Sequence, residues 1–229
     1  MSKCIAIIPA RGGSKRIPRK NIKPFLGKPI IAYSIESALQ SKLFDEVMVS
    51  TDDDEIAKIA LHYGANVPFM RSKKNANDFA TTFDVLEEVL GRYSKYEYAA
   101  CIYPTAPFVT TKDLKSAFEL LISKRYDSVF PVIKYGHPIE RALEIEKEQG
   151  SIKMIKSENL NKRSQDLNPA YHDAGQFYFF KIKPVSQAKK LFTSNTGAII
   201  VDENEAQDID TLIDWKMAEL KYKLKHEIP

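Results

Sequence analysis

The chain has 229 residues, of which 44% are hydrophobic and 28% charged, and its formal net charge is +4. This composition is ordinary for a globular protein, and the charge alone is too small to indicate nucleic-acid binding. No apolar run approaches the roughly 20 residues that span a bilayer, and the first one, at 4–8, is too short for a signal peptide. We therefore expect a cytoplasmic protein with no membrane and no nucleic-acid partner.

Apolar runs alternate with helical patterns over the first 130 residues. Strands are predicted at 3–9, 45–50, 66–70, 98–103 and 127–133, and helices at 28–41, 53–63, 81–93 and 111–124. Such alternation is typical of parallel βαβ units with helices on both faces of a sheet. The predicted fold class is therefore α/β, a three-layer doubly wound domain with a mainly parallel sheet. In such sheets ligands bind at the carboxyl ends of the strands.

The pattern changes after Pro131. Residues from about 135 to 170 carry many charges and no persistent period, and we interpret them as a small insertion, a hairpin arm used for dimerisation. Strands resume at 175–181 and 197–201, and the capping box Thr211-Leu-Ile-Asp214 opens a last helix at 211–225. We expect one domain over 1–229. Cys4 and Cys101 lie in short apolar runs and are expected to be core residues, not a disulfide or a metal pair.

A basic, glycine-containing loop, PARGGSKRIPRKN at 9–21, directly follows the first predicted strand. Six of the 34 Lys and Arg lie between positions 11 and 23, with no carboxylate among them. Gly12 and Gly13 let backbone amides approach an anion, and Arg11 and Lys15 add charge-assisted hydrogen bonds. The spacing is neither Walker A nor GxGxxG. We predict binding of a compact polyanion such as a nucleoside triphosphate; a solvated loop and a nucleic-acid patch are the alternatives.

The same segment resembles the signature of the CMP-sialic acid synthetases, the cytidylyltransferases of nine-carbon acidic sugars. The resemblance continues with Arg71, with YPTAPF at 103–108, HP at 137–138 and DIDT at 208–211, so it covers nearly the whole chain. It implies a nucleotide-diphospho-sugar transferase-like fold, CTP and a nine-carbon acidic sugar as substrates, Mg²⁺ as cofactor and a homodimer. The nucleotide-binding positions that it implies are Ala10, Arg11, Gly12, Gly13, Ser14, Lys15, Lys20, Asn21, Arg71, Thr81 and Thr82.

Departures from the usual pattern narrow the sugar. Sialic acid synthetases usually have Gly where Arg16 stands, LQPTSPL where this chain has IYPTAPF, and NG where it has Ala174-Gly175. These variants, with YHDAGQFYFF at 171–180, resemble the pseudaminic acid cytidylyltransferase branch, which implies CMP transfer to pseudaminic acid in surface-glycan or flagellin glycosylation. Sialic or legionaminic acid is the alternative sugar. A non-catalytic nucleotide-binding or assembly protein is the alternative of another class.

Asp208-Ile-Asp210 places two carboxylates on one face if the backbone is extended. Such a pair suits Mg²⁺ alongside triphosphate oxygens and water, although Asp210 or Thr211 could instead cap the following helix. The resemblance implies that both aspartates bind the divalent ion. With Arg11 and Lys15 they are the expected catalytic residues, sharing the charge that develops as the anomeric hydroxyl attacks the α-phosphorus in line.

The remaining candidates contact the sugar or the base. The expected sugar-binding residues are Tyr103, Thr105, His137, Asp173, Gln176 and Tyr178. A turn or a packing role is the open alternative for several of these, and Thr81 or Thr82 could cap a helix instead of contacting the nucleotide. The acidic run 52–54 is expected to begin a helix, where carboxylates suit the dipole, and receives no chemistry. No residue is an obvious general base.

Overall fold

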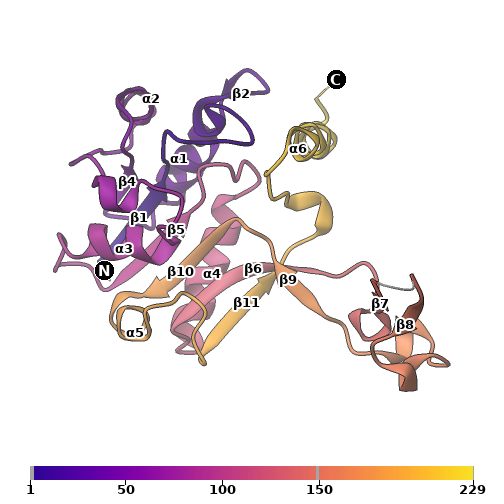
Figure 1. Cartoon of the computed structure of the whole chain (residues 1–229). Helices are drawn as coiled ribbons and strands as arrows, with labels where there is room; N and C mark the ends of the chain where they lie inside the picture. The colour runs from indigo at the N-terminus through magenta and orange to yellow at the C-terminus, as the bar shows by residue number, and fades with distance from the viewer. Residues whose placement is uncertain (1–2, 148–149, 229) are drawn as a thin grey trace.

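The computed structural model describes residues 3–147 and 150–228. Its centre is a seven-stranded sheet with helices on both sides, from which a small arm projects (Figure 1). In sheet order the strands are β11 (Thr196–Ile200), β6 (Ser128–Lys134), β10 (Phe177–Lys181), β5 (Tyr98–Ile102), β1 (Cys4–Pro9) and β4 (Glu46–Ser50), with β9 (Tyr171–Asp173) also paired to β6. All but β9 and β10 run in one direction. The predicted mainly parallel α/β fold is confirmed.

The two faces of the sheet carry separate cores, because successive side chains of a strand point to opposite faces. On one face Cys4, Ala6 and Ile8 pack with α1 (Ile30–Ser41), α2 (Asp54–His62) and α4 (Thr111–Ser123). On the other, Ile5 and Ile7 pack with α3 (Thr82–Leu90) and α5 (Ile182–Ala188). The result is the predicted three-layer arrangement. Cys4 and Cys101 are buried free thiols, as expected.

Side-chain caps fix where the helices begin. Asp53 accepts hydrogen bonds from the amides of Glu55 and Ile56 at the start of α2. Thr81, Thr110 and Thr211 each form a capping box with the acid three residues later, at α3, α4 and α6 (Leu212–His226). The acidic run at 52–54 therefore begins a helix, as predicted, and Thr211 rather than Asp210 caps α6.

Two local predictions differ from the structure. Residues 66–70 are not a strand: only Asn66 makes an isolated bridge, to Met48 on the edge strand β4. Pro68, which has no amide hydrogen to donate, interrupts any further pairing. The helix α5 was not predicted, because seven residues are too few for a helical apolar period to be recognised.

The segment predicted to be an insertion does contain a hairpin. β7 (Leu143–Ile145) pairs antiparallel with β8 (Ile152–Met154), away from the main sheet (Figure 1). A third, two-stranded sheet joins β2 (Pro24–Phe25) and β3 (Lys28–Pro29) beside the basic loop. The short 3-10 helices are η1 (Lys20–Ile22), η2 (Lys73–Asn75), η3 (Ile139–Arg141), η4 (Ser157–Asn159), η5 (Ser164–Asp166) and η6 (Glu203–Glu205). Within the described ranges no helix is both long and apolar enough to cross a bilayer.

Candidate active site

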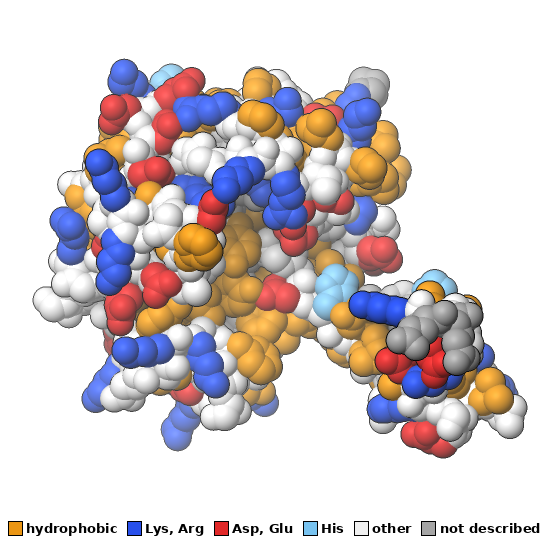
Figure 2. Space-filling view, viewed as in Figure 1, with side chains coloured by type: hydrophobic (Ala, Val, Ile, Leu, Met, Phe, Trp, Pro, Cys, Tyr) orange, Lys and Arg blue, Asp and Glu red, His pale blue; other side chains and the backbone are white. Residues whose placement is uncertain are grey.

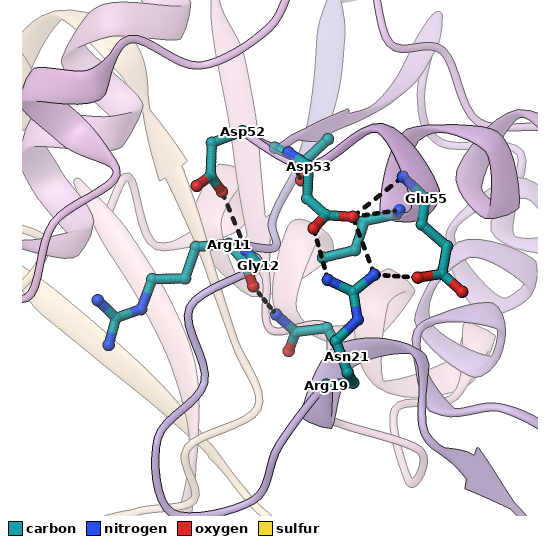
Figure 3. A network of polar contacts seen from close by, with 9 residues as sticks. Arg11, Gly12, Arg19, Asn21, Asp52, Asp53 and Glu55 are labelled. Carbon is teal, nitrogen blue, oxygen red and sulfur yellow. Dashed lines mark hydrogen bonds and ion pairs between the residues drawn. The ribbon is translucent and has the colours of Figure 1, made fainter.

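The basic loop leaves the carboxyl end of β1 and is closed on itself by polar contacts (Figure 3). The side-chain amide of Asn21 donates to the carbonyl oxygen of Arg11 at 2.9 Å. The backbone N–H of Gly12 donates to a carboxylate oxygen of Asp52, also at 2.9 Å. The expected phosphate-facing amide of Gly12 is thus already bonded to a side chain from the next strand's end.

Arg19 anchors the far side of the loop to the start of α2 (Figure 3). Its backbone is left-handed, with φ +56°, and its guanidinium donates to both oxygens of Asp53 and to Glu55. Hydrogen bonding from Arg19 lowers the pKa of Asp53 to about 2. Gly12 lies against the same carboxylate: a Cβ at Gly12 would stand 2.7 Å from Asp53 Oδ2, whereas one at Gly13 would meet nothing within 4 Å. The absence of a side chain at Gly12 therefore lets the loop backbone lie against the carboxylate of Asp53.

Carboxylates from distant segments pair with the cations of the loop. Asp78 accepts from Arg11 at 2.8 Å and also from Lys15, and these hydrogen bonds lower its pKa. Arg16 donates to Asp210 at 2.7 Å. The loop, which has no acid of its own between positions 11 and 23, is thus partly neutralised in space.

A cavity of about 430 Å³ lies between the loop, the carboxyl end of β5 and the segment before α6. Figure 2 shows this face of the molecule hollowed, with hydrophobic side chains in its depth and Lys and Arg side chains above it. The residues lining the cavity are Pro9, Arg11, Ser14, Lys15, Arg16, Ile17, Lys20, Asn21, Tyr103, Pro104, Thr105, Asp208 and Asp210. Nine of the predicted site residues therefore meet here: Arg11, Ser14, Lys15, Lys20, Asn21, Tyr103, Thr105, Asp208 and Asp210.

The two aspartates face the cavity from one side of the chain. Ile209 between them is 1% exposed and packs in the core under α6, so the alternation predicted for an extended backbone is present. Partial burial raises the pKa of Asp208, and the negative charge of Asp210 raises it further. Lys20 opposes both effects; its ammonium donates to the carbonyl of Ile209 at 2.6 Å and lies 3.7 Å from Asp210.

Asp208 and Asp210 have the hard oxygen donors that Mg²⁺ prefers, so the pair fits this ion. Within residues 3–147 and 150–228, however, no group of three or more His, Cys, Asp or Glu side chains is placed to hold a metal. An octahedral ion bound by this pair would take its other oxygens from water or a triphosphate. Gly175, with φ +64°, brings its backbone to Asp208: a Cβ there would lie 3.4 Å from the carboxyl carbon.

Tyr103 lines this cavity and two others. One, of about 220 Å³, is lined by Arg71, Thr81 and Thr82, and the other, of about 700 Å³, by Thr82, Asp173 and Tyr178 among others; Tyr103 lines all three. Residues 173–176 lie beside these cavities because β10 is antiparallel, so that it begins at the edge of the sheet where β5 ends. The amide of Tyr103 donates to the carbonyl of Gln176 at this edge.

A family model described as cytidylyltransferase matches residues 5–211 of the chain. The chain belongs to the cytidylyltransferase family. It is a CTP-dependent nucleotidyltransferase, and the family resemblance found in the sequence is confirmed.

Individual relatives are similar over nearly the whole cytidylyltransferase. The pseudaminic acid cytidylyltransferase of Campylobacter jejuni subsp. jejuni serotype O:2 is 43% identical over 229 residues, 98% of each chain. The CMP-N,N'-diacetyllegionaminic acid synthase of Legionella pneumophila subsp. pneumophila is 33% identical over 236 residues, 97% of each chain. A solved CMP:2-keto-3-deoxy-manno-octonic acid synthetase in complex with CTP matches 99% of this chain and 100% of its own with a TM-score of 0.71; at 19% identity this supports the fold alone.

Five of the predicted residues do not line these three cavities: Ala10, Gly12, Gly13, His137 and Gln176. His137 lines a separate cavity at the base of the arm. The side chain of Gln176 is 2% exposed and donates to the carbonyl of Glu205, so it holds the segment before Asp208. Ala10 is fully buried and donates its amide to Ser50. Arg71 does line a cavity, although its guanidinium also donates to Ser50.

Sequence reasoning did not identify the acids that pair with the basic loop. It also did not identify one wall of the 700 Å³ cavity. Asp52 accepts a hydrogen bond from Gly12, 40 positions earlier in the chain. Asp78 accepts one from Arg11, 67 positions earlier. Phe192, with Lys189 and Lys190, lines the 700 Å³ cavity from a turn after α5. The local signal for this wall is the run 189–192, in which two cations are followed by two large apolar residues.

Proposed function

We propose that this cytidylyltransferase transfers CMP from CTP to the anomeric hydroxyl of pseudaminic acid and releases pyrophosphate. The observation that carries the proposal is the 43% identity, over 98% of both chains, to a pseudaminic acid cytidylyltransferase. The relative that makes CMP-N,N'-diacetyllegionaminic acid is ten percentage points less similar. Sialic and legionaminic acids remain the alternative sugars to be tested.

The three cavities that Tyr103 lines suit the triphosphate, the cytidine and the sugar. The triphosphate lies in the 430 Å³ cavity beside Arg11 and Lys15, whose charges favour it. The cytidine lies in the adjoining cavity with Arg71 and Thr82. The sugar occupies the larger, more apolar cavity with Asp173 and Tyr178. Tyr103 stands where these parts meet, and the α-phosphorus is then placed near it.

The reaction needs positioning and charge neutralisation more than covalent chemistry. The sugar oxygen forms a bond to the α-phosphorus, the bond between that phosphorus and the bridging oxygen breaks, and the hydroxyl proton passes to solvent. Arg11 and Lys15 stabilise negative charge on the phosphate oxygens, as Lys20 does from beside Asp210. Mg²⁺ held by Asp208 and Asp210 would supply Lewis-acid polarisation of those oxygens.

The arm supports a proposal about assembly. Leu143 and Ile145 of β7 and Ile152 of β8 lie on one face of the hairpin and are 58%, 63% and 63% exposed. Apolar side chains gathered on one face of a projecting element favour burial against a partner. We therefore place the homodimer contact on this face of the arm. Since CTP is a nucleotide of the cytoplasm, we expect the enzyme to act there.

The test is pyrophosphate release from CTP and Mg²⁺, with pseudaminic, sialic and legionaminic acids supplied in parallel. Release with pseudaminic acid, lost in Asp210→Asn but kept in Asp202→Asn, supports the sugar and the aspartate pair together. Asp202 is an exposed acid that caps η6 outside the described cavities, and asparagine preserves the cap. Pyrophosphate release with sialic or legionaminic acid alone would make that sugar the substrate in place of pseudaminic acid. CTP binding without release from any of the three supports the non-catalytic alternative.

A further inference from the structure

We propose that Arg16 closes the metal site of the nucleotide-free enzyme: its guanidinium occupies the Asp210 carboxylate and hinders a divalent cation until a triphosphate draws it away. The inference rests on the proposed function and adds an order to it. The nucleotide binds first, or together with the ion, and the ion alone binds weakly. Arg16 thereby becomes a positioning residue that acts through Asp210.

The ion pair itself is the first observation. Arg16 Nη2 lies 2.7 Å from Asp210 Oδ1, although the residues are 194 positions apart. Arg16 comes from the outer part of the basic loop, and its side chain is 65% exposed. Asp210 is its one hydrogen-bond partner within the described parts of the chain. An exposed arginine held by a single carboxylate can leave it at small cost.

A second cation strengthens the effect on the same carboxylate. The ammonium of Lys20 is 3.7 Å from the same oxygen of Asp210 and is fixed by its bond to the carbonyl of Ile209. A divalent ion approaching Asp210 therefore meets two positive charges within a few ångströms. Lys20 is only 22% exposed and is held in place, whereas the side chain of Arg16 is 65% exposed. Arg16 is therefore the removable part of this barrier.

The ligand set gives the third observation. The site offers two carboxylates, one of which Arg16 occupies, and the described residues provide no third acid or imidazole for the ion. A hexacoordinate ion needs further oxygens, which a triphosphate supplies. Arg16 lines the same 430 Å³ cavity as Arg11 and Lys15, so phosphates bound there offer it an alternative anion. One ligand thus removes the guanidinium and completes the coordination.

Mn²⁺ binding without nucleotide tests the inference, because the free ion is counted directly by electron paramagnetic resonance. Since an exposed ion pair is worth up to about 1 kcal/mol, Arg16→Ala is expected to bind Mn²⁺ about fivefold more tightly than wild type. Asp210→Asn in the Arg16→Ala background is expected to abolish the gain. Lys15→Ala is the matched control: it removes a charge of the same loop that pairs with Asp78, and its Mn²⁺ affinity should stay within about twofold of wild type.

Each other outcome overturns the inference. Unchanged or weaker Mn²⁺ binding in Arg16→Ala means that the guanidinium does not compete with the ion. An equal gain in Lys15→Ala means that only the general charge of the loop matters. The side chains of Arg16 and Lys15 are exposed and support no core packing. Arg16→Ala and Lys15→Ala should therefore keep the wild-type melting temperature, and this measurement verifies that both variants are folded. If pyrophosphate release by wild type persists while the Mn²⁺ result fails, the order of binding is wrong; if release is absent with every sugar, the proposed function is wrong whatever the titration gives.

Discussion

The side-chain amide of Asn21 donates to the backbone carbonyl of Arg11 across 2.9 Å, and this contact joins the two ends of the basic loop (Figure 3). Asn21 is 6% exposed, so the bond is shielded from water. The resemblance implies that Asn21 contacts the nucleotide. Its position shows that it also sets the path of the chain that carries Arg11 and Lys15, and a variant at this position must affect both.

Asn21→Ala should therefore weaken CTP binding through the loop. It leaves the Arg11 carbonyl without its donor, at a cost of about 1–2 kcal/mol in the free energy of unfolding. We expect the KM for CTP to rise about tenfold, since 1.4 kcal/mol is a factor of ten, with little change in the KM for the sugar. Urea denaturation and steady-state kinetics measure the two effects. Lower stability with an unchanged KM for CTP would show that the loop path does not govern nucleotide binding.

The adjacent glycines provide a matched pair. Gly12→Ala places a methyl group 2.7 Å from Asp53 Oδ2 and must displace that carboxylate or the loop, whereas Gly13→Ala enters open space. Overpacking of this kind costs about 1–3 kcal/mol, so Gly12→Ala should lower the melting temperature by several degrees and raise the KM for CTP. Gly13→Ala should leave the melting temperature unchanged. Equal melting temperatures for the two variants would contradict the role given to the contact with Asp53.

The pair of Arg19 and Asp53 predicts a dependence of stability on acid pH. Because the pKa of Asp53 falls from 3.8 to about 2 on folding, its ionised form stabilises the fold above pH 4, and this contribution is lost as the pH falls through about 2. Asp53→Asn keeps a helix-capping oxygen but loses the charge. It should lower the free energy of unfolding by about 1–2 kcal/mol at pH 7 and by almost nothing near pH 2.

Denaturation of wild type and Asp53→Asn at several pH values checks this. Asp54→Asn is the control, because Asp54 is an exposed acid at the next position of the same helix. A deficit that stays constant from pH 7 to pH 2 would mean that the asparagine acts through packing and not through the ion pair.

The parts of the fold that sequence predicts are those whose signal is local. The apolar run Cys4–Pro9 and the capping box at Thr211 are each complete within a few residues, and both stand where they were expected. The direction of β10 leaves no such signal, because a buried strand has the same side-chain pattern in either orientation. The prediction of a short strand at 66–70 was wrong, because it rested on the apolar pattern and did not consider that Pro68 has no amide hydrogen to donate.

The candidate site divides in the same way. The glycines and cations of the loop are contiguous, so their grouping is readable from the sequence. Their partners are not: Arg16 meets Asp210 across 194 positions, and Lys15 meets Asp78 across 63. Sequence also left open whether Asp210 or Thr211 caps α6. Thr211 takes that role, which leaves the carboxylate of Asp210 directed to the cavity.

Tyr178 should affect the sugar and not the nucleotide. Its hydroxyl donates to Asp173 in the wall of the 700 Å³ cavity. Its ring packs edge-on against that of Tyr103, with the two ring centroids 5.9 Å apart. Tyr178→Phe keeps the ring but frees the carboxylate of Asp173 from this bond. We expect the KM for the sugar to rise about tenfold, the effect of losing one charged hydrogen bond of about 1.4 kcal/mol, and the KM for CTP to stay within about twofold. Tyr63→Phe, outside the described cavities, is the control. Equal increases in both KM values would remove Tyr178 from the sugar site.

The arm should decide the oligomeric state. Ile152 is 63% exposed and lies opposite Ile145 on the apolar face of the β7–β8 hairpin, whereas Lys153 and Glu144 pair on the other face. If that face is buried between two copies, Ile152→Glu places a charge in an apolar interface without a partner, which costs several kcal/mol of association free energy. Light scattering after gel filtration should then report a dimer for wild type and a monomer for Ile152→Glu. Lys153→Glu changes charge on the opposite face and should remain dimeric. A dimer that survives Ile152→Glu would place the contact elsewhere on the molecule, and a monomeric wild type would remove the dimer altogether.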